Sequence, residues 1–177
     1  MGVASEIPSL LSEAKRYLKQ KYEKPGNVYL GIVSRLDAPV TGVLVLARTS
    51  KAAARLTEQF RSKQVQKAYW ALVPPGLAAD QATLRDWVRK DERHRRMHIA
   101  REDVSGAKEA ILDYRTLQSN RRSTLLEVDL QTGRKHQIRL QLSHDGYPIL
   151  GDRKYGSEVS FPKGIALHAY SLSFQHP

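Results

Sequence analysis

The sequence contains no cysteine, and its acidic residues are scarce beside its basic ones. The absence of cysteine excludes disulfide bonds, zinc ribbons, iron–sulfur clusters and thiol catalysis, and it is compatible with a reducing compartment. No apolar run approaches the ~20 residues that a transmembrane helix needs. The first residues also lack the basic start and long apolar stretch of a signal peptide. We therefore expect a cytoplasmic protein with no membrane partner.

The charge balance points to a polyanionic partner. The 177 residues include 29 Lys or Arg and 18 Asp or Glu, which gives a net charge of +11. Nucleic acid is the leading candidate for a partner of so basic a chain, and a merely solubilising surface is the alternative. Hydrophobic residues make up 41% of the chain, enough for a packed core. The length predicts a single domain over residues 1–177.

The pattern of apolar residues and turn residues predicts an α+β fold. Helices are expected over residues 7–22, over 49–63 with Thr49 or Ser50 as N-cap, and from 132–134 to 143 or 144. Strands are expected over residues 28–33, 42–47, 66–73, 110–117, 124–131 and 165–174. The polar segment 119–122 predicts a hairpin loop, so that the sheet is mixed, mainly antiparallel, and flanked by helices and loops.

Asp37 is the first candidate for a chemical role. It lies where a predicted strand runs into a turn that contains Pro39, and Arg35 stands two residues before it. A carboxylate at such a position is held rigidly and can still reach a ligand. An Asp that accepts hydrogen bonds from turn backbone is the alternative interpretation.

The segment 132–139, Thr-Gly-Arg-Lys-His-Gln-Ile-Arg, is the second candidate. On a helix, Lys135 and Arg139 are four residues apart, and His136 and Arg139 are three apart, so these groups share a broad face. Such donors at a helix N-terminus make an anion site, and we predict that Arg134, Lys135 and His136 bind substrate. A solvated basic face is the alternative.

Two further features concern contacts with nucleic acid. Tyr69 lies in a predicted strand, where it either stacks on a base or fills the core. The basic segment 85–101 is interpreted as a loop that contacts phosphates, or else as a solvated charged segment. His94 and His98 are four residues apart but have no cysteine or suitably spaced carboxylate beside them, so no metal site is predicted.

Together these segments resemble the RluA-type pseudouridine synthases. Residues 34–42 (SRLDAPVTG) are similar to that family's His-Arg-Leu-Asp-x-x-x-Ser/Thr-Gly signature, and residues 59–69 resemble its helix and Lys-x-Tyr segment. Residues 132–139 resemble its Thr-Gly-Arg-x-His-Gln-Ile-Arg motif. Residues 146–152 and 167–169 continue the match in the same order. The resemblance covers the chain from about residue 7 to its last residues.

The resemblance implies a role for each matching residue. Asp37 matches the catalytic aspartate, and Arg139 matches the arginine that pairs with it, orients it and favours its charged form. Tyr69 matches the active-site tyrosine that stacks on uracil. Arg35 matches a residue that fills the space left by the flipped nucleotide, and Leu167 matches an apolar wall of the pocket. Addition of Asp37 to the sugar, its addition to the base, and abstraction of a sugar proton all stay open.

Two departures from the family pattern are visible. Ser34 stands where the family usually has His, which weakens arguments that need an imidazole there. The family normally has one or two strands, ending in an Asn-Lys-Pro-x-Gly-like segment, before the first helix. We expect this chain to lack them, which leaves either a truncated start or a shortened core with an exposed sheet edge.

The resulting prediction is an RNA pseudouridine synthase that acts on a uridine in ribosomal or transfer RNA. The resemblance implies no metal and no organic cofactor, and we expect a monomer. A non-catalytic RNA-binding or chaperone relative with the same fold is the main alternative. A metal-dependent nuclease that uses Asp37 and histidines is a third interpretation, against which the lack of clustered carboxylates counts.

Overall fold

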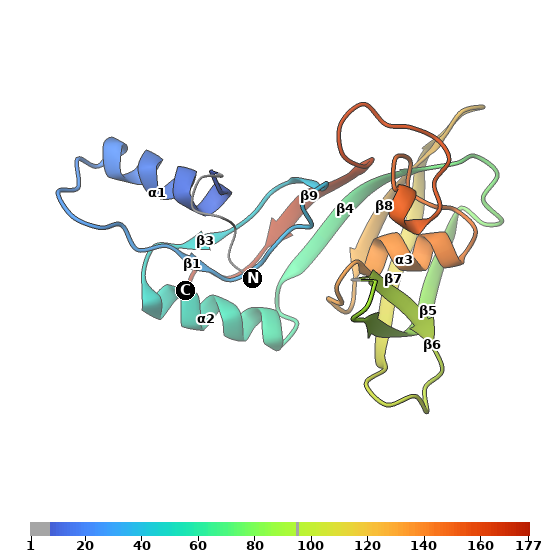
Figure 1. Ribbon diagram of the computed structural model, residues 1–177, viewed down its shortest axis with the longest axis horizontal. Coiled ribbons are helices and arrows are strands. Elements are labelled where there is room, and N and C mark those ends of the chain that lie inside the picture. The colour runs from blue at the N-terminus through green and yellow to red at the C-terminus, as the bar shows by residue number, and fades with distance from the viewer. Residues whose placement is uncertain (1–7, 95) are drawn as a thin grey trace. The chain divides into compact units, whose positions relative to one another are not determined.

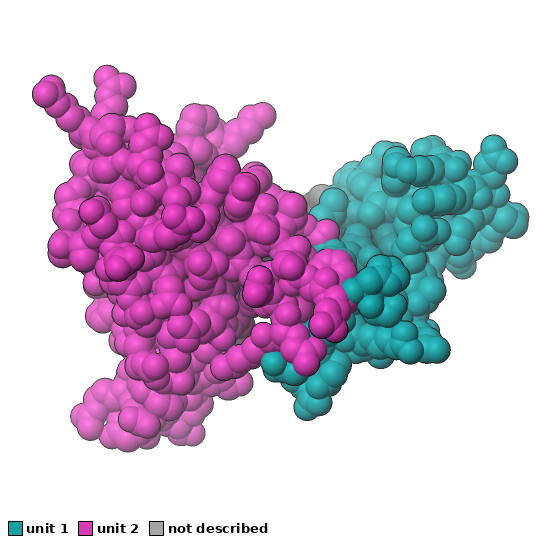
Figure 2. All heavy atoms as spheres, turned by 180° about the vertical axis from the view of Figure 1, so that it is seen from behind, with its two compact units in different colours: residues 1–35, 45–62, 176–177 teal, residues 36–44, 63–175 magenta. Residues whose placement is uncertain are grey.

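The computed structural model describes residues 8–94 and 96–177, which group into two compact units (Figure 2). The first unit contains residues 8–35, 45–62 and 176–177, and the second contains residues 36–44 and 63–175. We describe each unit by itself. The interpretation of residues 1–177 as one domain stays a prediction.

The first unit combines two helices with a short antiparallel pair of strands. Its elements are α1 (Leu10–Lys21), β1 (Gly31–Ile32), β3 (Leu46–Ala47) and α2 (Ser50–Arg61). The Ser9 side chain caps α1, and the Thr49 hydroxyl accepts the Ala52 N–H at 3.1 Å to cap α2. These caps satisfy backbone donors that the first turn of a helix leaves unpaired. Both predicted helices are confirmed, although α1 begins at Leu10 and the expected start at residue 7 lies outside the described residues.

The second unit is built on a mixed sheet. Among the described residues, seven strands pair in the order β2-β9-β4-β8-β7-β5-β6; β2 runs parallel to β9 and the other neighbours are antiparallel. The strands are β2 (Thr41–Gly42), β4 (Gln66–Val73), β5 (Gln81–Asp91), β6 (Arg96–Ala100), β7 (Lys108–Ser119), β8 (Thr124–Leu130) and β9 (Leu167–Ser173). The predicted α+β class with a mainly antiparallel sheet is therefore confirmed.

The core of this unit lies between the sheet and α3 (Gln137–His144), which covers one face of the strands (Figure 1). Ile138 and Leu142 of α3 pack with fully buried residues of β7 and β8, Leu112 and Leu126 among them. Burial of these apolar side chains away from water stabilises the sheet and holds α3 against it. A single-turn 3-10 helix, η1 (Arg153–Tyr155), follows α3.

Three local predictions are wrong. The apolar run 42–47 is not one buried strand: Gly42 ends β2, whereas Leu46 begins β3 in the other unit. The third helix begins at Gln137, because His136 adopts a left-handed conformation with φ 53° and ends the preceding turn. The basic segment 85–101 is not a loop, since it consists mainly of β5 and β6, which pair as a hairpin.

Within the described part of the chain, no helix has both the length and the apolar character required to span a membrane.

Candidate active site

Asp37 lies in a turn that is fastened to strand β9. The Asp37 carbonyl accepts the Val40 N–H at 2.9 Å, and the Val43 N–H donates to the Ala169 carbonyl at 2.9 Å. Gly42 has a φ of +124°, and a Cβ atom there would lie 2.3 Å from the Ala169 carbonyl oxygen. Only glycine permits this close approach of two backbones. The parallel pairing of β2 with β9 therefore fixes the position of the turn from which the Asp37 side chain extends.

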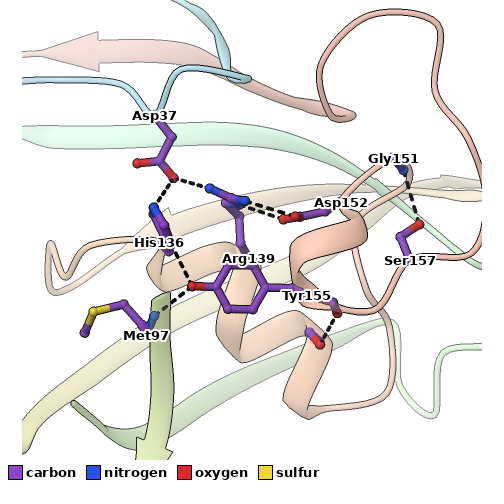
Figure 3. A network of polar contacts seen from close by, with 9 residues as sticks. Asp37, Met97, His136, Arg139, Gly151, Asp152, Tyr155 and Ser157 are labelled. Atoms are coloured by element: carbon purple, nitrogen blue, oxygen red, sulfur yellow. Dashed lines mark hydrogen bonds and ion pairs between the residues drawn. The ribbon is translucent and has the colours of Figure 1, made fainter. Parts of the chain in front are cut away.

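Arg139 joins Asp37 to a second carboxylate, Asp152 (Figure 3). Its Nη1 donates to Asp37 Oδ2 at 2.9 Å, its Nε donates to Asp152 Oδ2 at 2.6 Å, and its Nη2 donates to Asp152 Oδ1 at 3.0 Å. The Arg139 side chain is 5% exposed. Burial lowers the pKa of Arg139, but its hydrogen bonds to the two carboxylates outweigh burial and raise this pKa above its ordinary value. The guanidinium is therefore permanently charged and held at three points.

Asp152 is a site residue that the sequence-based reasoning missed. Its side chain is 2% exposed, and its carbonyl accepts the N–H groups of Tyr155 and Ser157 around η1. Residues 146–152 matched the family pattern, but nothing in that motif indicated which side chain its acid would face. The pairing is visible only once α3 and η1 are folded together.

His136 lies on the other side of Asp37. Its Nε2 is 3.7 Å from Asp37 Oδ2, and its Nδ1 is 2.7 Å from the Tyr155 hydroxyl oxygen. Burial lowers the pKa of His136, and the Asp37 charge opposes this shift without cancelling it. The ring is therefore neutral near pH 7, with one nitrogen that donates and one that accepts.

The Tyr155 hydroxyl favours one of the two tautomers of His136. Its oxygen accepts the buried Met97 N–H at 3.0 Å, and its own proton has Nδ1 of His136 within reach. If Tyr155 donates to Nδ1, the ring proton is on Nε2, the nitrogen that faces Asp37, and this is the tautomer that we expect. Tyr155 was also missed by the sequence-based reasoning, and its place 19 residues from His136 gives no local signal.

Tyr69 and Leu167 lie on the face of the sheet that packs against the core. In the register of β4 with β9, Ala71 is opposite Leu167 and Tyr69 is opposite Ala169, so the two side chains share that face. Burial raises the pKa of Tyr69, and the negative charge of Asp37 raises it further. Tyr69 is thus a neutral phenol within the electrostatic reach of Asp37. Leu167 is 4% exposed.

The remaining predicted site residues have other surroundings. The Arg134 Nε donates to the Glu109 carbonyl at 2.8 Å, which holds this side chain against β7. Lys135 is exposed, and its charge contributes to lowering the pKa of His136. Because Lys135 precedes α3, it does not share a helical face with Arg139, and the spacing argument for that pair is wrong. Arg35 is exposed and belongs to the first unit, so its role stays a prediction.

The segment 132–137 has a structural function in this fold. Thr132 and Arg134 both donate to Gln137 Oε1, at 2.8 and 2.9 Å, and Gln137 Nε2 donates to the Ile111 carbonyl at 3.0 Å. These bonds shape the turn that brings His136 into its left-handed conformation. Among the residues that the structure describes, no group of three or more His, Asp or Glu side chains is placed to hold a metal ion.

The arrangement consists of a fixed carboxylate beside a charged guanidinium, a neutral imidazole and a neutral phenol. Residues 2–144, which contain all four of these groups, match the model of the RNA pseudouridylate synthase family. The chain belongs to this family, and its recognition from sequence motifs is confirmed.

Named relatives agree with this assignment. The chain is 40% identical over 161 residues to ribosomal large subunit pseudouridine synthase D of Xylella fastidiosa, with 83% of this chain and 47% of the relative covered. It is 35% identical over 162 residues to the protein of the same name from Pseudomonas aeruginosa, with 83% and 49% covered. The chain thus spans about half the length of the curated relatives it matches. Among solved structures, human RNA pseudouridylate synthase domain containing 4 superposes with a TM-score of 0.77 at 27% identity, covering 92% of this chain and 73% of the human one.

Proposed function

We propose that this chain isomerises a uridine to pseudouridine in RNA, with Asp37 as the catalytic aspartate. The observation that carries the proposal is the contact of Asp37 with Arg139, which is itself fixed by Asp152, in a chain of this family. Asp37 is partly accessible, with 26% of its side chain exposed, whereas its two polar neighbours are almost fully buried. This difference leaves one carboxylate oriented by the protein and open to a substrate.

The reaction breaks the bond between the ribose and N1 of uracil and forms a bond from the same ribose carbon to C5. C5 loses a proton and N1 gains one, so the product is an isomer of the substrate. Arg139 orients Asp37 and balances its charge as the bond breaks. Tyr69 stacks on the detached uracil, and Leu167 forms an apolar wall against it. Arg35 fills the place that the flipped nucleotide leaves in the RNA.

The substrate in this proposal is ribosomal or transfer RNA. Large-subunit ribosomal RNA is the first choice, because it appears in the names of the relatives. In this proposal Arg134, Lys135 and His136 bind the substrate, and the basic hairpin of β5 and β6 contacts RNA phosphates. The protein acts as a monomer in the cytoplasm.

The deciding experiment incubates the chain with unmodified transcripts of large-subunit ribosomal RNA and of transfer RNA, followed by carbodiimide mapping of pseudouridine. We expect pseudouridine with the wild type and none with Asp37→Asn. If wild type yields no pseudouridine, or if the product survives Asp37→Asn, the proposal is wrong. RNA binding without conversion would instead support a non-catalytic relative. Strand cleavage that EDTA abolishes would support a nuclease.

A further inference from the structure

A cavity of about 500 Å³ lies beside the candidate active site, between β6, α3 and η1 of the second unit. Its volume is within the range of ~300–1,000 Å³ that small-molecule sites occupy. The cavity is open to solvent, and β6, which contributes to its lining, is the edge strand of the sheet. The reaction proposed above gives this cavity no role.

The lining of the cavity combines basic and apolar side chains. Arg96, His98, His144 and Lys154 contribute to it, and the described residues that line it include no Asp or Glu. Its apolar part includes Ile99 and Leu140. A ligand that fits this lining carries a negative charge and also a flat or apolar portion. A nucleotide has both, in its phosphate and its base.

Tyr155 connects the cavity to Asp37. Tyr155 lines the cavity, and its hydroxyl oxygen is 2.7 Å from Nδ1 of His136. On the far edge of that imidazole, Nε2 lies 3.7 Å from Asp37 Oδ2. A molecule in the cavity is thus separated from the proposed catalytic carboxylate by two side chains. A nucleotide that directly precedes or follows the reacting uridine in the same RNA strand would lie at this kind of separation from Asp37.

We propose that this cavity binds one nucleotide of the substrate RNA next to the target uridine. Arg96 and Lys154 contact its phosphate, and its base lies against Ile99 and Leu140. The inference rests on the proposed function, because only an RNA substrate places a second nucleotide beside the reacting one. The inference adds a site that recognises the nucleotide next to the target uridine, in addition to the site that binds the uridine itself.

The test uses the full chain carrying Asp37→Asn, labelled with ¹⁵N, and pentauridylate as the probe. We expect the amide signals of Ile99 and Gly156 in the cavity to shift together with that of Arg139. In the same background, Arg96→Ala with Lys154→Ala should weaken binding about tenfold and abolish the shifts at Ile99 and Gly156. The control pair Arg121→Ala with Arg122→Ala removes the same charge from the loop between β7 and β8, and it should change the affinity by less than about twofold.

Several results would overturn the inference. If Arg139 shifts and the cavity signals do not, the cavity is not a nucleotide site, although the proposed function stands. If neither set shifts, the cavity inference is also wrong, and the pseudouridine assay decides the proposed function separately. If inorganic phosphate or penta-glutamate produces the same cavity shifts at the same concentration, the site is selective for an anion or an acidic peptide and not for a nucleotide.

Discussion

Arg139 and Asp152 form a two-point ion pair in the protein interior, and the remaining nitrogen of the same guanidinium holds Asp37. Because a guanidinium is planar and rigid, fixing two of its nitrogens fixes the direction of the third. Asp152 therefore positions Asp37 without touching it. The sequence motifs pointed to Asp37 as the proposed catalytic aspartate and to Arg139 as its partner, and the structure adds Asp152, the acid that holds Arg139.

Replacing Asp152 by Asn should impair both stability and turnover. The variant leaves the buried charge of Arg139 with only Asp37 as an acidic partner, and removing one member of a buried pair costs about 3 kcal/mol or more of unfolding free energy. A displaced guanidinium misplaces Asp37, so single-turnover rates should fall on the order of 100-fold. Chemical denaturation and single-turnover formation of pseudouridine measure the two effects.

Asp103→Asn is the matched control for this substitution. Asp103 pairs with Arg101 at 2.9 Å on the surface, where the two side chains are 66% and 84% exposed. Exposed pairs contribute little, so this variant should match the wild type within about 0.5 kcal/mol. Equal effects of the two Asn variants would show that the buried position of Asp152 has no special importance.

Replacing Tyr155 by Phe should change the protonation pattern of His136. Loss of the hydroxyl removes the partner of Nδ1 and leaves the Met97 N–H unpaired, which costs about 1–3 kcal/mol. In the wild type, the ¹⁵N shifts of the ring should report a proton on Nε2, and in the variant this preference should weaken. Turnover should fall in parallel.

Tyr147→Phe provides the comparison, since the Tyr147 hydroxyl also has two hydrogen-bond partners, the Ala78 N–H and the Gly76 carbonyl, but these lie in an exposed loop. The ring shifts of His136 should not change in this variant. An unchanged Nε2–H tautomer in Tyr155→Phe would refute the assignment of the imidazole proton by Tyr155.

The stability of the protein should fall as pH drops through about 6.5, in part because of His136. Burial holds the pKa of this group below its ordinary value of 6.5, so near that pH the unfolded chain binds more protons at this position than the folded chain does. Proton uptake therefore favours unfolding. In His136→Gln, the loss of stability between about pH 7.5 and about pH 5.5 should be smaller. Urea denaturation measures this loss. If the wild type and His136→Gln lose the same stability over this pH range, the pKa of His136 is not lower in the folded chain than in the unfolded chain.

Charge reversal in the hairpin of β5 and β6 should weaken the binding of RNA whatever the nucleotide sequence of that RNA. Arg89 and Arg93 are exposed there and do not line the cavity. Arg89→Glu with Arg93→Glu should reduce the slope of log affinity against log salt by about 1 for each RNA phosphate that the variant no longer binds.

Arg139→Ala should abolish turnover with only a modest decrease in affinity. Similar behaviour of the two variants would refute the division between catalytic and backbone-binding residues.

Sequence patterns predicted best the elements whose signals are local. The strand 66–73 and the Thr49 cap agree with the structure because alternation, proline breaks and capping residues act within a few positions. The run 42–47 misled the prediction, since a continuous apolar stretch does not reveal that Gly42 and Leu46 pair with different strands. The left-handed His136 was equally hidden, because side-chain bonds from Thr132 and Gln137 stabilise a conformation that few residues other than glycine adopt.

The candidate site shows the same division. Asp37, His136 and Arg139 were found because each stands in a recognisable motif, and the structure brings them together. Asp152 and Tyr155 act through contacts with α3 and the turn before it, which form only when distant segments pack. A motif such as residues 146–152 marks Asp152 as part of the family pattern, but a single sequence does not show which side chain it meets.

The route of the chain around residue 36 separates two neighbouring positions of one motif. Residues 36–44 belong to the second unit, whereas Arg35 and residue 45 belong to the first. The turn that carries Asp37 therefore belongs to the same unit as Arg139 and Asp152, and the contact between Asp37 and Arg139 lies wholly within that unit. Arg35, the residue proposed to replace the flipped nucleotide, is two residues from the proposed catalytic acid in the chain but belongs to the other unit. One sequence motif thus contributes a proposed functional residue to each unit.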